Sequence, residues 1–152
     1  MSFREKSAWI GLLINIAVFG PYFLKVFAPL GRGDLELDWG GLLGTFIGAC
    51  TLLVILSIVF NIALAIHDRN QPTDERDRAI EAKAFRVSYY VLVTACFLAG
   101  FALFALGGFA ELPVLERPAQ AYALMSQVLL LGLVLSESAH YVTQVVSYRL
   151  GA

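Results

Sequence analysis

The chain has 152 residues, of which 59% are hydrophobic and only 15% are charged, and its mean hydropathy is +0.73. This composition is typical of an integral membrane protein and excludes a soluble domain of ordinary composition. The formal net charge of -1 gives no basic surface, so the expected partner is the lipid bilayer and not nucleic acid.

Four apolar segments divide the chain, over residues of about 7–27, 40–66, 74–107 and 120–149. A membrane-spanning helix needs about 20 predominantly apolar residues, and each segment meets that length. The sequence therefore predicts an all-α fold in which residues 1–152 form a single four-span transmembrane domain, an integral membrane four-helix bundle.

The first segment contains Pro21 and is followed by Pro29, and Asn15 is a polar residue in its apolar interior. Gly20-Pro21 predicts a kink, and Pro29 predicts that the helix ends near residue 27 and that a loop begins at Ala28. Asn15 lies within the apolar run, so we expect it to face other helices.

The second segment contains Gly40, Gly44 and Gly48, spaced four residues apart. This spacing places the three glycines on one ridge of a helix, where the backbone of another helix can approach closely. The partner is expected to be a helix of the same chain, with a second copy of the chain as the alternative.

A polar connection leads into the third segment. Pro72 disfavours helix at the preceding residue, Thr73 or Asp74 is placed to cap the next helix, and acids follow in its first turn. We expect the third helix to begin in water and to extend into the cytoplasm. Its charged start forms a predicted docking surface, made of Asp74, Glu75, Arg76, Asp77 and Arg78.

Positive residues predict the orientation, because lysine and arginine concentrate on the cytoplasmic side of membrane proteins. Eight lie on the side of the amino terminus and three on the opposite side: Arg4, Lys6, Arg69, Arg76, Arg78, Lys83, Arg86 and Arg149 against Lys25, Arg32 and Arg117. Both termini are therefore predicted to be cytoplasmic, in a multi-pass protein of the bacterial inner membrane. Aromatic residues are expected at the two interfaces, Tyr22 near the outer one and Tyr148 near the inner one.

A resemblance accompanies this topology. The two helix pairs are joined by Thr73-Asp74-Glu75-Arg76-Asp77, followed by Lys83-Ala84-Phe85-Arg86 and Tyr89-Tyr90. This arrangement resembles an uncharacterised family of small four-helix prokaryotic membrane proteins marked by a cytoplasmic Asp-Glu-Arg segment. The resemblance implies the fold and a role for Asp74, Glu75 and Arg76.

The fourth segment has an unusually polar inner half. Glu137, His140 and Gln144 recur at helical spacing and share one face. A charge at the bilayer centre costs about 2.5 to 3.5 kcal/mol on the insertion scale, so an ionisable residue there is a candidate for function. The candidate ligand or proton site comprises Glu137, His140, Gln144, Asn61 and Asn15. The alternative is purely structural, with Glu137 bonded to Asn15, Asn61 or His140.

Metal or haem binding is a further alternative. Glu-x-x-His on a bundle helix offers a carboxylate and an imidazole to one ion, and His67 lies toward the same side of the membrane. The sequence therefore leaves two kinds of site open. One is a single metal ion held by His67, Glu137 and His140, and the other is a haem held by His67 and His140. The cofactor is otherwise unknown.

No nucleophile elbow, zinc-protease motif or phosphate loop is present in the sequence. We therefore expect a non-enzymatic binding, sensory or regulatory protein that acts as a homodimer or with a partner membrane protein. The alternative is a small proton- or ion-coupled transporter that works as a dimer, since histidine titrates near neutral pH.

Overall fold

The computed structural model describes residues 3–31, 39–67, 74–108 and 118–150, which form four α-helices. They are α1 (Phe3–Gly31), α2 (Trp39–His67), α3 (Glu75–Gly108) and α4 (Pro118–Leu150). The predicted all-α fold is confirmed, and each helix lies on one of the four apolar segments.

All four helices are long and apolar enough to cross a membrane. Their candidate spans are Arg4–Pro29, Gly40–Leu64, Glu75–Ala102 and Leu124–Leu150. Length and composition thus indicate a multi-pass membrane protein.

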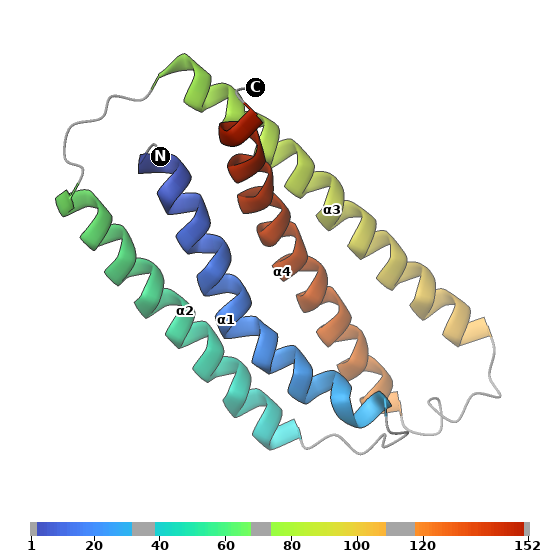
Figure 1. The fold of residues 1–152 in the computed structure, drawn as a ribbon. Coiled ribbons are helices and arrows are strands. Elements are labelled where there is room, and N and C mark those ends of the chain that lie inside the picture. The colour runs from blue at the N-terminus through green and yellow to red at the C-terminus, as the bar shows by residue number, and fades with distance from the viewer. Residues whose placement is uncertain (1–2, 32–38, 68–73, 109–117, 151–152) are drawn as a thin grey trace.

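The helices lie side by side in the order α2, α1, α4, α3 (Figure 1). The principal packing pairs among the described residues are α3 with α4, α1 with α4 and α1 with α2. Helices α1 and α4 therefore occupy the middle. The start of α1 and the end of α4 lie at the same end of the molecule (Figure 1), which we call the charged end because α3 also begins there with its acidic first turn.

Helix α1 is longer than predicted at both ends. It begins at Phe3, and it continues through Pro21 and Pro29 to Gly31, so the expected loop start at Ala28 is wrong. A proline in the last turn removes only one backbone hydrogen bond, and its fixed φ suits a helix.

The best-buried side chains lie on α1. Tyr22, Val26 and Asn15 are almost fully enclosed, and the Tyr22 hydroxyl donates to Gln127 Oε1 of α4 at 2.6 Å. The ring of Tyr22 also packs against Phe46 of α2, and its expected place near the outer membrane interface stays a prediction. Tyr22 joins three helices in the interior.

The glycine ridge of α2 does not face a helix of the same chain. A Cβ added at Gly44 or Gly48 would meet no described atom within 4 Å, so the preferred internal partner is wrong. Leu42, Phe46 and Leu53 are the residues that pack toward α1. At about 100° per residue, this stripe lies on the opposite side of α2 from the glycines.

Glycine instead permits the close approach of α3 and α4. A Cβ at Gly132 would lie 2.5 Å from the Cβ of Ala95, and an alanine side chain has no rotamer that relieves such a clash. The backbones of α3 and α4 can therefore approach only while residue 132 has no side chain.

This approach predicts the effect of Gly132→Ala. The substitution should lower the free energy of unfolding by about 1 to 3 kcal/mol, because the helices must separate to admit the methyl group. Gly100→Ala in α3 is the matched control, since its Cβ would meet nothing within 4 Å among the described residues. Reversible unfolding in mixed detergent measures both, and equal stability of the two variants would contradict this packing.

Candidate functional site

A pocket of about 360 Å³ lies between α3 and α4. Its walls combine apolar and polar side chains: Phe85 and Ser88 of α3, with Leu133, Ser136, Glu137, His140 and Tyr141 of α4. Small-molecule sites usually occupy about 300 to 1,000 Å³, so the pocket is at the lower end of that range. The structure therefore brings Glu137 and His140 into one pocket.

Two serines hold the helices together beside this pocket. The Ser136 hydroxyl donates to the backbone carbonyl of Ser88 at 2.9 Å, and the two hydroxyls lie 2.9 Å apart. Since Ser136 has one proton to donate, Ser88 supplies the proton of the second bond. Both hydroxyls thus have a partner although they lie within membrane-spanning helices.

Glu137 is the middle residue of the α4 span, 13 residues from Leu124 and 13 from Leu150. Its Oε1 accepts a hydrogen bond from the Tyr141 hydroxyl at 3.3 Å, one helical turn away. At the middle of a membrane span the free-energy cost of a charge is greatest. Glu137 also forms part of the wall of the open pocket.

His140 lies against the Phe85 ring, with the ring centroids 4.6 Å apart. The Gln144 side-chain amide lies 3.0 Å from Nε2 of the imidazole. Nδ1 is buried and has no hydrogen-bond partner among the described residues. With the amide donating to Nε2, the neutral ring carries its proton on Nδ1, which is then a buried donor without an acceptor.

The pocket therefore offers two complementary groups. Glu137 supplies an acceptor when ionised, and the His140 imidazole, whose buried Nδ1 has no partner among the described residues, forms another part of the wall. A buried polar group without a partner is destabilising by about 1 to 3 kcal/mol, so a ligand that satisfies it gains affinity.

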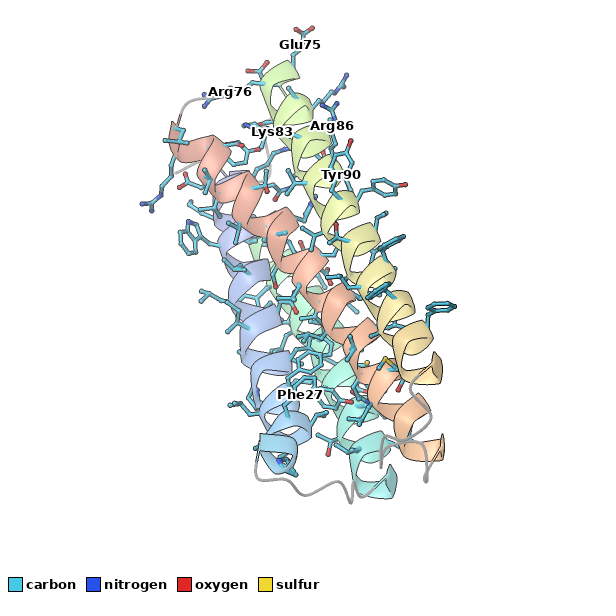
Figure 2. The ribbon with its side chains drawn as sticks, turned by 90° about the vertical axis from the view of Figure 1, so that its right-hand side faces the viewer. Phe27, Glu75, Arg76, Lys83, Arg86 and Tyr90 are labelled. Atoms are coloured by element: carbon cyan, nitrogen blue, oxygen red, sulfur yellow. The ribbon has the colours of Figure 1, made fainter. Side chains whose placement is uncertain are left out.

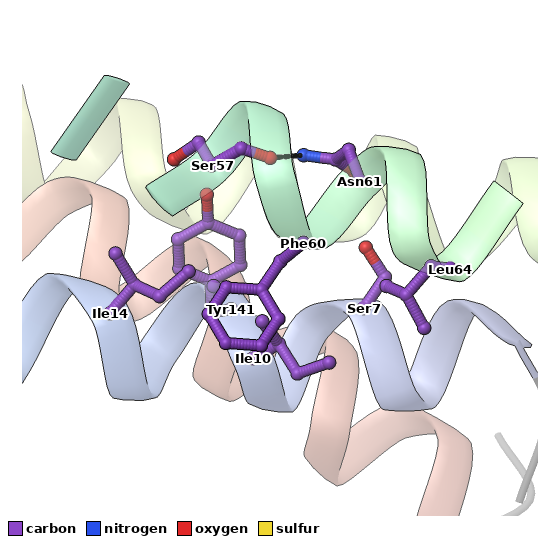
Figure 3. Close-up of a pocket in the computed structure, with 9 residues that line it drawn as sticks. Ser7, Ile10, Ile14, Ser57, Phe60, Asn61, Leu64 and Tyr141 are labelled. Carbon is purple, nitrogen blue, oxygen red and sulfur yellow. Dashed lines mark hydrogen bonds between the residues drawn. The ribbon is translucent and has the colours of Figure 1, made fainter. Parts of the chain in front are cut away.

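A second cavity of about 120 Å³ lies among α1, α2 and α4. Its polar lining consists of Ser7, Ser57, Asn61 and Tyr141 (Figure 3). The Asn61 amide donates to the Ser57 carbonyl of its own helix at 2.7 Å. Asn61 is thus placed apart from Glu137 and His140, and Tyr141 borders both cavities.

Asn15 joins α1 to α4 and lines neither cavity. Its amide donates to the Val134 carbonyl at 3.4 Å and to the Ser138 hydroxyl at 3.3 Å. The predicted inward orientation is confirmed, although its partners are the residues that flank Glu137.

Ion pairs join three helices at the charged end. Arg4 of α1 lies 3.4 Å from Asp77 and 3.3 Å from Glu81 of α3, while the Tyr148 hydroxyl of α4 donates to Asp77 at 3.0 Å. Arg149 of α4 pairs with Glu5 of α1 at 3.5 Å. The partners come from different helices and lie far apart in the sequence, so helical spacing alone could not have found these pairs.

The predicted docking surface divides into two parts. Asp74 caps α3, since its Oδ1 accepts from the Glu75 backbone N–H at 2.7 Å, which confirms one of the two predicted caps. Asp77 is bonded inward, to Arg4 and Tyr148. Glu75, Arg76 and Arg78 are exposed, and Figure 2 shows Glu75 at the tip of α3.

The candidate metal site is only partly described. Within residues 3–31, 39–67, 74–108 and 118–150, no three His, Cys, Asp or Glu side chains gather closely enough to hold a metal ion. The side chain of His67 lies outside the described residues, so its predicted role with Glu137 and His140 stays a prediction.

Comparison of the chain with protein-family models, with curated proteins and with solved structures finds no match. The functional argument therefore rests on the pocket and on the charged end.

The charged end predicts different effects for two neighbouring acids. Asp77→Asn should lower the free energy of unfolding by about 1 to 2 kcal/mol, because Arg4 loses a charged hydrogen-bond partner. Glu75→Gln, the matched change at the exposed tip, should leave it unchanged. Unfolding of both variants in detergent at low and high salt measures the effect. If Asp77→Asn is as stable as the wild type, the ion pairs do not stabilise the packing of the helices.

Proposed function

We propose that this chain is a non-enzymatic membrane protein that binds a small lipid-soluble molecule in the α3–α4 pocket and has a sensory or regulatory role. The observation that carries the proposal is that Glu137 and His140 both line one open cavity of about 360 Å³, while the buried Nδ1 of His140 has no hydrogen-bond partner among the described residues. A packing role for these residues would instead favour a filled space with every polar atom bonded.

The chemistry of the walls indicates the kind of ligand. Phe85 and Leu133 suit an apolar body, and the imidazole of His140 presents a ring edge. A hydroxyl on the ligand would donate to Glu137, and a carbonyl would accept from His140 Nδ1. We therefore propose a flat hydroxy-carbonyl compound, as in hydroxylated quinones.

The route into the pocket runs through the lipid. Phe85 is 60% exposed and Leu133 is 51% exposed on the faces of α3 and α4. In a membrane these side chains contact acyl chains, so a lipid-soluble molecule would reach the pocket without crossing water.

Helix α3 connects the pocket to the charged end. It contributes Phe85 and Ser88 to the pocket walls, and the exposed Glu75, Arg76 and Arg78 lie two to four turns earlier on the same helix. Filling the pocket would push on α3 and change the position of these charges. A partner membrane protein bound to these charged residues would respond to their change of position.

Orientation and assembly complete the proposal. Both termini are proposed to be cytoplasmic in a bacterial inner membrane, because the sequence places eight of the eleven lysines and arginines on that side. A homodimer is proposed through the exposed Gly44–Gly48 face of α2. A fluorescent reporter fused after Ala152 tests the orientation, and the protein mass in detergent tests the dimer.

Binding of an alkylated hydroxynaphthoquinone tests the proposed ligand class. This probe carries one hydroxyl and two carbonyl groups on a flat ring. We expect saturable binding to the purified protein in nanodiscs, weakened by about tenfold in Glu137→Gln and in His140→Phe, since each loses one hydrogen bond worth about 1.4 kcal/mol.

Asn61→Leu provides the matched control, because Asn61 lines only the other cavity. Its affinity for the probe should equal that of the wild type. Probe binding that is non-saturable, or equal in the wild type and the Glu137→Gln variant, would refute the proposal.

A further inference from the structure

Tyr141 lies between the two cavities described above. On one side its ring borders the cavity of Ser7, Ser57 and Asn61, and on the other side it borders the pocket of Glu137. Figure 3 shows the ring between α1 and α2 with its hydroxyl on the α2 side of the cavity.

The Tyr141 ring can pack against α1 because residue 11 of α1 is a glycine. A Cβ at Gly11 would lie 2.6 Å from two ring atoms of Tyr141, so the ring rests directly on the α1 backbone. The hydroxyl remains available for hydrogen bonding, and it donates to Glu137 at 3.3 Å.

The two cavities lie at different depths. Ser7 is three residues from the start of the α1 span, and Asn61 is three residues from the end of the α2 span. Both positions lie near the charged end, whereas Glu137 is at the middle of its span. Tyr141 lies one turn closer to the charged end than Glu137, between the shallow cavity and the deep carboxylate group.

The shallow cavity is suited to water. Its volume of about 120 Å³ equals the liquid volume of about four water molecules, and hydroxyl and amide groups line it. Asn61 is exposed and lies three residues from the end of the α2 span, so the cavity reaches the protein surface close to the charged end.

We propose that Tyr141 carries protons between water in the Ser7–Ser57–Asn61 cavity and the carboxylate of Glu137. In the uptake step a hydronium ion in the cavity gives a proton to the Tyr141 oxygen as the Tyr141 hydroxyl proton moves to Glu137. The products are water, an intact tyrosine and a neutral carboxylic acid. Release is the reverse.

The groups around Glu137 agree with a single titrating carboxyl. Among the described residues that line the two cavities, the titratable side chains are Glu137, His140 and Tyr141, all on α4. Helix α3 contributes Phe85 and Ser88, while α1 and α2 contribute serines, Asn61 and apolar or glycine residues. The inference deepens the proposed function, because it names how the binding carboxylate gains and loses its proton.

The test is a pH-jump experiment on the full chain in nanodiscs. Time-resolved infrared spectroscopy follows the carboxylic acid C=O band, and subtraction of the Glu137→Gln spectrum isolates Glu137. In Tyr141→Phe, which keeps the ring on Gly11, we expect the protonation rate to fall by about tenfold or more. Asn61→Leu, which fills the water cavity without touching Glu137, should slow the rate as well.

Gly100→Ala is the matched control away from both cavities, because its added Cβ meets no described atom within 4 Å, and its rate should equal that of the wild type. An unchanged rate in Tyr141→Phe, or slowing in Tyr141→Phe without slowing in Asn61→Leu, would overturn the route. Absence of a titrating Glu137 band in the wild type would overturn it too. Binding of the hydroxynaphthoquinone probe is measured on the same samples. If the probe does not bind but the protonation kinetics are as expected, the ligand proposal fails and the proton route stands.

Discussion

The carboxyl group of Glu137 at the middle of an apolar helix is the constraint on which the other contacts depend. A charged or polar group at that depth has to be hydrogen-bonded, since lipid offers no partner. Tyr141 supplies the bond, and its ring needs the bare backbone of Gly11. The requirement of one carboxyl group thus extends to the way α1 meets α4.

The residues on either side of Glu137 form hydrogen bonds to the two helices that pack against α4. Ser136 bonds α3, and Ser138 bonds Asn15 of α1. Two residues within one turn of α4 therefore hold both adjacent helices through hydrogen bonds. Such bonds suit a membrane environment, where apolar burial alone gives little preference for a helix partner over lipid. The open pocket beside Glu137 exists because Gly132 and the serine pair fix the separation of α3 and α4 on either side of it.

The sequence predicted the four helices because they depend on local composition and spacing. It also placed Glu137 and His140 together, since residues three apart share a helix face. It could not predict that Tyr22 is buried or that the α2 glycines face outward, because these facts depend on which helices become neighbours. Gly11 and Gly132, which permit the real close approaches, stand alone in the sequence, without the four-residue repeat that drew attention to α2.

The order α2, α1, α4, α3 has a consequence for synthesis. The side-chain hydrogen bonds of Asn15 and Tyr22 to α4 join residues 105 to 123 positions apart, so α1 is synthesised long before α4. During that interval Asn15 lacks the acceptors that α4 later provides, and only α2 and α3 have been made. The final assembly step is therefore the arrival of α4 in the place beside α1, and the nascent chain must keep that place open until the last helix is translated.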